Sequence, residues 1–158
     1  MRIQILSPLL FISLFLACNS GDKFKVQEES TFIPDYLIGN FEDDYEIQYS
    51  VTDSSFILLP NSVYHIKEWD INEQYFIAQN DNSNSYDPSK WSRIDWIQLS
   101  NMEPYVWAFC LSIYNAESAE EAKQSDNIEP ESPKTGCNNF PFSRMKIIDS
   151  LDTNIPSY

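Results

Sequence analysis

The segment Glu46-Ile47-Gln48-Tyr49-Ser50-Val51 decides the fold, because polar and apolar side chains alternate through it without a break. Alternation is the period of a half-buried β-strand, whose successive side chains point to opposite faces of a sheet. Thr52-Asp53-Ser54 follows as a turn, and the strand pattern resumes over residues 55–59. The sequence therefore predicts two neighbouring strands joined by a short connection.

The same pattern continues along the rest of the chain. Further strands are expected at residues 63–69, 75–79, 91–99, 105–114 and 145–148, with turns at 60–61, 70–74 and 101–104 and a polar loop at 81–90. Short strands at this spacing predict an all-β fold, a small antiparallel β-barrel or a strongly curved meander. Only Gly39 and Gly136 fall in this part of the chain, so the turns should use Asn and Asp for left-handed backbone angles.

One short helix is expected near the C-terminal end. Ser118-Ala119-Glu120-Glu121 has the form of a capping box, and only Ala119 and Ala122 offer a packing face. Residues 127–136, which include two prolines, are expected to form an exposed linker. Phe140-Pro141-Phe142 should then return the chain to the core.

The N-terminus has the layout of a secretory signal. Arg2 precedes an apolar run over residues 3–16, which ends in Leu14-Phe15-Leu16-Ala17-Cys18 and turns polar at once. This ending resembles the lipobox of bacterial lipoproteins, in which the Cys thiol takes a diacylglyceryl group and becomes the new N-terminus. The alternative is ordinary cleavage after Ala17, with Cys18 left as a free residue.

The lipoprotein interpretation sets the expected organisation. Residues 1–17 are the signal peptide, 18–31 are the lipidated Cys and a polar tether, 32–148 are one β-barrel domain, and 149–158 are a frayed tail. Several acyl chains hold a protein firmly, since each buried CH₂ contributes about 0.8 kcal/mol. Asn19 stands where an Asp would favour inner-membrane retention, so we expect a lipid-anchored protein of the bacterial outer membrane.

The charge and the cysteines restrict the partners. The chain carries 24 acidic and 10 basic residues, a net charge of −14, which disfavours nucleic acid and anionic lipid headgroups. If Cys18 is lipidated, Cys110 and Cys137 remain, and in an oxidising compartment they predict a disulfide, the alternative being two free thiols. A single histidine argues against a zinc site, and no metal or cofactor is expected.

Aromatic residues fall at many alternating positions of the predicted strands, where one set faces the inside of the sheet and the other the outside. The candidate pocket or core residues are Trp69, Phe76, Trp96, Trp107 and Phe109. In a small barrel such side chains either fill the lumen or line a cavity for an apolar ligand, and we favour packing. Arg93 and Asp95 lie two apart on one strand, hence on one face, where they form a structural ion pair or orient a polar ligand group.

Other reactive groups give weak signals. His65 has no partner that the sequence identifies, and neighbouring carboxylates at Glu42, Asp43 and Asp44 should diverge in a turn. Residues 81–87 alternate oxygen side chains as calcium loops do, but Tyr86 stands where an EF-hand needs Gly, so no EF-hand is expected and a looser calcium site is the alternative. Because none of these groups forms a recognisable catalytic pattern, we expect that the protein is not an enzyme.

Two resemblances support the fold. Gly39-Asn40-Phe41 resembles the Gly-x-Trp opening of lipocalin-type barrels, in which the aromatic ring plugs the barrel floor against a late Arg, with Arg144 as the counterpart by position. The stretch from Phe76 to Ser143, with Cys110 and Gly136-Cys137, is similar to uncharacterised small lipid-anchored bacterial proteins. The resemblance implies a lipocalin-like β-barrel and no activity.

The function expected from the sequence is binding. We expect a lipid-anchored envelope protein whose barrel binds a small apolar or amphipathic molecule. The alternative is an interaction protein with a filled barrel that docks onto a protein partner in the envelope. The state of the barrel interior distinguishes the two.

Overall fold

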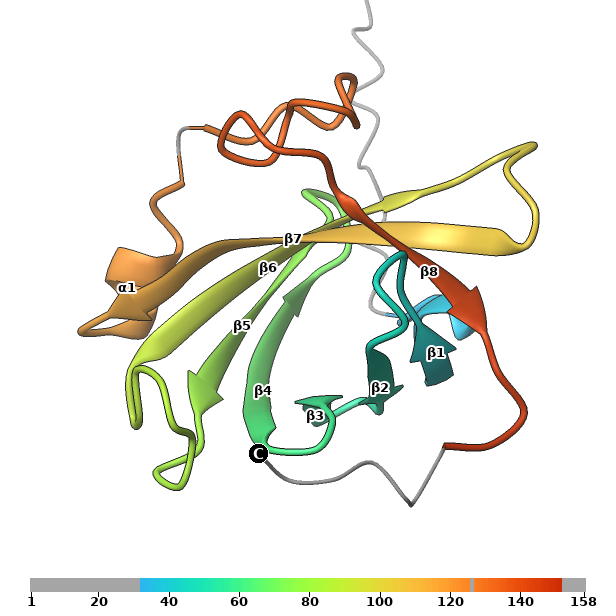
Figure 1. Cartoon of the computed structure of the whole chain (residues 1–158). Helices are drawn as coiled ribbons and strands as arrows, with labels where there is room; N and C mark the ends of the chain where they lie inside the picture. Colours follow the sequence, from blue (N-terminus) through green and yellow to red (C-terminus); the bar gives the residue numbers. More distant parts are fainter. Residues whose placement is uncertain (1–31, 126, 152–158) are drawn as a thin grey trace, which may run out of the picture.

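The computed structural model describes residues 32–125 and 127–151, which are coloured along the chain in Figure 1. The expected signal peptide, Cys18 and the tether lie outside the described residues, as does most of the expected tail. No helix in the described part of the chain is long and apolar enough to cross a membrane.

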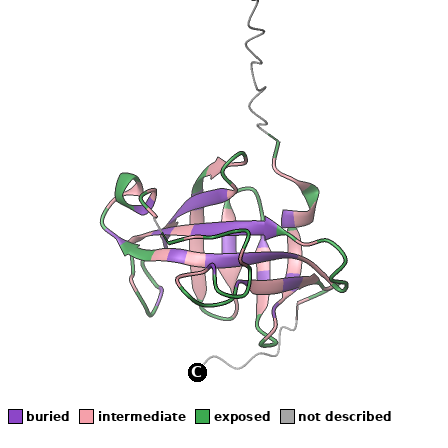
Figure 2. Cartoon of the chain, turned by 90° about the horizontal axis from the view of Figure 1, so that it is seen from above, coloured by how far each residue is buried: buried purple, intermediate pink, exposed green. Residues whose placement is uncertain are grey.

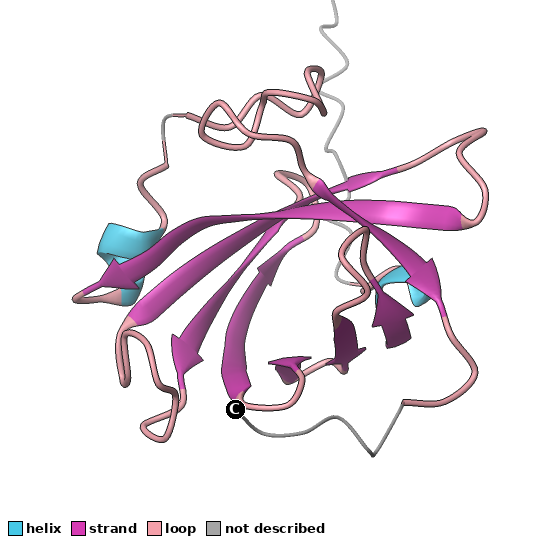
Figure 3. Cartoon of the chain, in the orientation of Figure 1, coloured by secondary structure: helices cyan, strands magenta, loops and turns pink. Residues whose placement is uncertain are grey.

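Eight strands form a closed antiparallel barrel, in which each strand pairs with its sequence neighbours and β8 closes on β1 (Figures 1 and 3). The strands are β1 (Gly39–Glu42), β2 (Gln48–Val51), β3 (Ser55–Leu58), β4 (Ser62–Asp70), β5 (Tyr75–Asn80), β6 (Trp91–Gln98), β7 (Tyr105–Ala116) and β8 (Ser143–Ile147). A 3₁₀ turn, η1 (Asp35–Leu37), precedes β1, and α1 (Ala119–Ala122) follows β7. The prediction of a small all-β barrel with one short helix near the C-terminal end is confirmed.

The turns use a wider set of residues than the sequence predicts. Left-handed φ angles occur at four Asn or Asp residues but also at Glu46, Gln74 and Ser89. Glu46, at φ 64°, closes the turn before β2, so this strand begins at Gln48 and not at Glu46. The β1–β2 turn is stabilised from inside by Asp43, whose carboxylate accepts the backbone N–H groups of Tyr45 and Ile47. The Asp43 side chain thus holds the turn in place of the glycine that such a tight turn usually contains.

The barrel interior is filled by side chains. Phe41, Phe76, Trp96 and Trp107 are fully buried in one cluster that runs through the lumen, and Figure 2 shows the buried residues along the strands. Ring contacts connect opposite walls, with centroids 5.4 Å apart for Phe56 on β3 and Phe109 on β7. Such edge-to-face pairs add about 0.5–1.5 kcal/mol each beyond the burial of area.

β7 is the longest strand and serves two parts of the molecule. Its first half pairs with β8, with Phe109 opposite Ser143 as the last register pair. Its second half continues beyond β8, and α1 packs there against β5, β6 and β7 (Figure 1). Ala122 is fully buried in this contact, which explains why so short a helix is retained.

The capping of α1 differs in one detail from the predicted capping box. The Ser118 hydroxyl accepts the N–H of Glu121 at 3.2 Å, as expected for an N-cap. The Glu121 carboxylate accepts the N–H of Glu117 and not that of Ser118. The side chain therefore reaches one residue further back than in a capping box.

Residues 127–142, which we call the covering segment, are more ordered than the expected linker. They lie over the outer wall of the barrel, with Ile128 bridging Cys137 through the backbone. The disulfide between Cys110 and Cys137 ties them to β7, which confirms the predicted bond. Phe142 is buried on the outer wall as expected, but Phe140 is 69% exposed and does not return to the core.

Candidate functional site

The five candidate aromatic residues lie in the barrel core. Trp96, Trp107, Phe76 and Phe109 are buried in the lumen cluster, and Trp69 packs against it. Rings lie only 4.7 Å apart for Trp69–Phe76 and 5.5 Å apart for Trp69–Trp96. None of the five lines any of the grooves described below. The structure thus assigns them to packing and leaves the outer wall as the place for a site.

A groove of about 590 Å³ lies on the outer wall, between the β1–β2 turn, the β6–β7 connection and the covering segment. We call it the outer groove. Its lining residues are Asp44, Tyr45, Leu99, Met102, Ala108, Pro133, Lys134, Pro141, Phe142, Ser143 and Arg144. The volume falls within the range of about 300–1,000 Å³ that is usual for small-molecule sites.

Most of the groove surface is apolar. Ala108 and Phe142 are buried at its floor, in the small cluster that packs on the outside of the barrel. Tyr45 and Met102 stand at its edge and are 69% and 39% exposed. Large apolar side chains in exposed turns are informative when they gather at one concave place, because isolated ones are common on any surface.

The covering segment is held firmly where it forms the groove wall. The Phe142 N–H donates to the Pro133 carbonyl at 2.9 Å, and the Gly136 N–H donates to the Ser132 carbonyl at 2.6 Å. A Cβ at Gly136 would lie 2.0 Å from the Glu129 carbonyl oxygen, so only glycine allows the two chains to approach this closely. Together with the disulfide, these contacts preform the groove.

Arg144 and Asp44 form a bidentate ion pair at the groove. The Arg144 Nη2 and Nε donate to Asp44 at 2.7 and 3.0 Å, its backbone N–H adds a third contact at 3.0 Å, and the guanidinium lies 4.3 Å from the Tyr105 ring centroid. Burial raises the pKa of Asp44, but the hydrogen bonds and charge of Arg144 outweigh it and leave the pKa below its ordinary value. The pair is therefore fully charged at neutral pH and internally neutralised.

The position of Arg144 corrects the expectation drawn from lipocalin-type barrels. Phe41 is fully buried in the lumen cluster, where its ring packs edge-on against Trp107 and not against Arg144. Met145 occupies the inner face of β8, so alternation turns Arg144 to the outer face, where it meets Asp44. On the same outer face Lys146 pairs with Glu42 at 2.7 Å across the β1–β8 seam.

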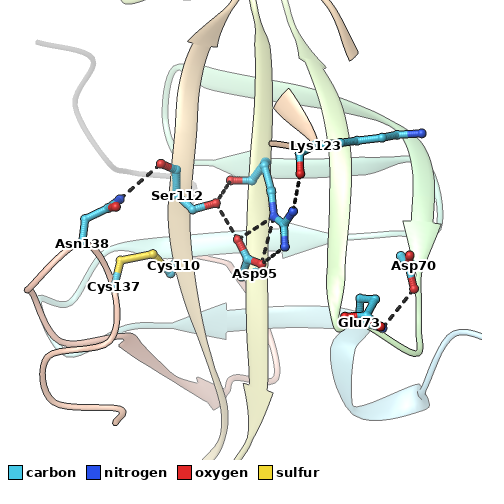
Figure 4. A network of polar contacts seen from close by, with 9 residues as sticks. Asp70, Glu73, Asp95, Cys110, Ser112, Lys123, Cys137 and Asn138 are labelled. Carbon is cyan, nitrogen blue, oxygen red and sulfur yellow. Dashed lines mark hydrogen bonds and ion pairs between the residues drawn. A yellow bond between two sulfur atoms is a disulfide. The ribbon is translucent and has the colours of Figure 1, made fainter. Parts of the chain in front are cut away.

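The structure brings Arg93 and Asp95 together within a buried polar network (Figure 4). The Arg93 guanidinium donates to Asp95 at 2.7 Å and to the Lys123 carbonyl at the end of α1, also at 2.7 Å, and covers the Tyr75 ring at 3.9 Å. Ser112 on β7 donates to the other Asp95 oxygen at 2.5 Å, and Asn138 donates to the Ser112 carbonyl (Figure 4). The network joins α1 and the covering segment to the sheet, which is a positioning role.

The remaining candidate groups bind one another. His65 Nε2 lies 2.7 Å from Asp81, a partner 16 residues away that local sequence cannot identify. In the loop expected to resemble a calcium site, Asn84 caps both backbone groups of Val63, and Asp81 accepts from Ser83. The described residues hold no group of three or more His, Cys, Asp or Glu side chains that could bind a metal ion.

The three acidic side chains of residues 42–44 point to three different partners. Glu42 pairs with Lys146, Asp44 pairs with Arg144, and Asp43 is buried and accepts the Tyr49 hydroxyl at 2.9 Å. Burial first, and then the Asp43 carboxylate, raise the pKa of Tyr49, so this phenol stays protonated. The carboxylates do not face one another as an acid–base pair would require.

Comparison with known proteins gives no relative. No family model, curated protein or solved structure matches the chain. The outer groove is therefore the functional candidate on its geometry alone. Sequence reasoning missed it, because its walls come from four places far apart in the chain, and the single available signal was apolar Tyr45 and Met102 in turns otherwise built from polar residues.

Proposed function

We propose that this protein is a lipid-anchored protein of the bacterial envelope that binds a small apolar or amphipathic molecule in the outer groove. The observation that carries the proposal is a concave, mostly apolar site of about 590 Å³ on a barrel whose interior is filled. Because the lumen is occupied by its own aromatic side chains, the site lies on the wall and not in the barrel. The proposal assigns no catalysis to the protein.

The barrel supports such a site as a rigid frame. Three of the groove walls are a hairpin turn, a strand connection and the covering segment. The turn is fixed by hydrogen bonds to Asp43 and Arg144, the connection by the Leu99 N–H to Val106 bond, and the segment by the disulfide to β7. A preformed site loses little conformational entropy on binding, which favours affinity for a small ligand. The lipobox-like ending at Cys18 supports attachment of this frame to a membrane.

The experiment is a binding titration on the mature domain, exported to the periplasm with Cys18→Ser. The neutral fluorescent probe N-phenyl-1-naphthylamine reports apolar binding without a charge effect. Tyr45→Glu places a charge at the groove edge, and Tyr86→Glu is the matched control, since Tyr86 is also exposed and lies away from this groove. We expect Tyr45→Glu to weaken probe binding about fivefold to tenfold through lost apolar contact.

Equal binding by both variants would contradict the assignment of the groove. Native mass spectrometry of the same preparation gives a second readout, because a bound molecule adds a mass that disappears on denaturation. A copurified mass that Tyr45→Glu removes and Tyr86→Glu retains would identify the class of ligand.

A second candidate function is docking to an envelope protein. The filled lumen favours it, and so does a second groove of about 490 Å³ along the half of β7 that extends beyond β8. Crosslinking in native envelopes would yield a defined heteromeric band if this function holds. A monomer alone would count against it.

A further inference from the structure

We propose that the ligand of the outer groove carries an anionic head group, which binds the ammonium group of Lys134 at the groove wall. This inference rests on the proposed function and adds the chemical class of the ligand, an amphiphile with an apolar body and one negative charge. It follows from the pairing of the basic side chains around the barrel.

Most of the basic side chains in the described part of the chain are paired. The described residues include seven, namely Lys67, Lys90, Arg93, Lys123, Lys134, Arg144 and Lys146. Five of them form ion pairs with carboxylates on the same barrel. Within the described part of the chain, Lys67 and Lys134 form none, and of these two only Lys134 lines the outer groove.

Among the described residues, no carboxylate therefore compensates the positive charge of Lys134 at the groove. Asp44 is its one acidic lining residue, and that carboxylate is taken up by Arg144 through a bidentate contact. Glu129 and Glu131, the acidic residues nearest to Lys134 in the covering segment, form no ion pair with it. In a chain with a net charge of −14, a free cation beside an apolar groove complements an anionic amphiphile.

The backbone around Lys134 is fixed. Pro133, the residue before Lys134, accepts the N–H of Phe142 at 2.9 Å. The N–H of Thr135, the residue after Lys134, donates to the Ser132 carbonyl at 2.9 Å. The ammonium group can therefore move only as far as its own flexible stem allows. An apolar chain lying on Leu99, Met102 and Phe142 would place its head group at this wall.

The charge of the whole protein does not cancel this attraction. Interactions between exposed charges are largely screened beyond about 8 Å at physiological ionic strength, so the nearest cation decides. An exposed ion pair contributes modestly, and we expect about a twofold to fivefold gain in affinity for the anion.

The test compares decanoate with decanol, which share an apolar chain and differ in charge, by calorimetric titration at pH 8 on the Cys18→Ser domain. We expect decanoate to bind about two to five times more tightly than decanol. Lys134→Glu should weaken decanoate binding more than decanol binding, and so abolish or reverse this preference. Lys67→Glu, which changes the net charge equally at an exposed site outside the groove, should retain it.

The outcomes separate the two proposals. If both ligands bind equally and Tyr45→Glu weakens both, the groove is the binding site and the head-group inference is wrong. If Lys67→Glu removes the preference as strongly as Lys134→Glu, the effect comes from the net charge, and the inference is also overturned. If neither ligand binds, the proposed function is wrong, and the head-group inference that rests on it is wrong with it.

Discussion

At the scale of single residues, Trp107 decides whether the barrel interior is a core. Its ring is fully buried between Phe41 and Phe109, and its Nε1–H has no acceptor among the described residues. We expect Trp107→Ala to lower the free energy of unfolding by about 3–5 kcal/mol because of the cavity it leaves. Trp107→Phe should cost less, since no hydrogen bond is lost. Urea denaturation measures both.

Unchanged stability of Trp107→Ala together with altered retention of the naphthylamine probe would show that Trp107 is a pocket wall. In that case the binding site would return to the lumen.

Asp44 gives a prediction about pH. Its pKa is lowered in the folded protein, so its ionised form stabilises the fold above the ordinary value of 3.8, and this stability is lost as the pH falls through the lower folded value. We expect Asp44→Asn to cost about 1 kcal/mol at pH 7, since the pair is partly exposed. The difference from the native chain should close below pH 3.8.

The measurement is urea denaturation at several pH values between 7 and 3. Asp149→Asn, which removes an exposed and unpaired carboxylate from the described chain, serves as the control. An equal cost for both variants at pH 7 would show that net charge and not the ion pair is responsible.

Contacts between residues far apart in sequence could not be predicted from local patterns. Arg93 and Asp95 are two apart on a strand, so their shared face follows from alternation. The partner of His65 lies 16 residues away, where the register of the β4–β5 hairpin places it, and the partner of Arg144 lies 100 residues away, where only the closure of β8 on β1 brings it. Residue contacts of this kind depend on register, which local patterns do not contain.

At the scale of elements, the disulfide is the feature with the largest expected effect. It closes a loop of 27 residues, for which chain entropy predicts a stabilisation of about 3–4 kcal/mol. We expect Cys110→Ser/Cys137→Ser to lose about this much in urea denaturation and to weaken probe binding, because the covering segment forms one wall of the groove.

Thiol titration provides the check on this element. The native domain should show no reactive thiol until it is both denatured and reduced. Two reactive thiols in the native protein, or unchanged probe binding by the double variant, would contradict the role given to the covering segment.

The strand pattern locates seven of the eight strands, and β1 (Gly39–Glu42) is expected only from the resemblance of Gly39-Asn40-Phe41 to the lipocalin opening. The ends and connections needed the structure. β7 runs two residues beyond its predicted end, because α1 packs on it, and β2 starts two residues late, because Glu46 takes a left-handed angle. The segment expected to be a linker became a groove wall through Gly136 and the disulfide. Tertiary contacts overrode the local composition in each case.

At the scale of the whole molecule, the sequence predicts a barrel but cannot predict whether its lumen is open. Alternation separates inner from outer residues, and aromatic residues at inner positions suit a filled core and a ligand cavity equally well. The structure decides through the contact of Phe56 and Phe109 across the lumen and the buried cluster around it. The outer groove could not be predicted, because it belongs to no single element.

The proposed anchor gives a prediction for the intact protein. We expect the full chain, expressed in a bacterium and labelled with palmitate, to incorporate label and to sediment with membranes. Cys18→Ser should lose the label and appear in the soluble periplasmic fraction, because acylation needs the thiol. Label retained in Cys18→Ser would show that the lipobox interpretation is wrong.

The seam between β1 and β8 has a mechanical consequence. Only two register pairs join these strands, and the ion pairs Glu42–Lys146 and Asp44–Arg144 cross the same seam. The chain enters the barrel through β1, so a pulling force applied from the N-terminal side acts on β1, which two register pairs hold to β8 and four hold to β2. The two ion pairs would then resist separation of β1 from β8. Arg144, which also borders the groove, would thus contribute to the force that the barrel withstands before it opens.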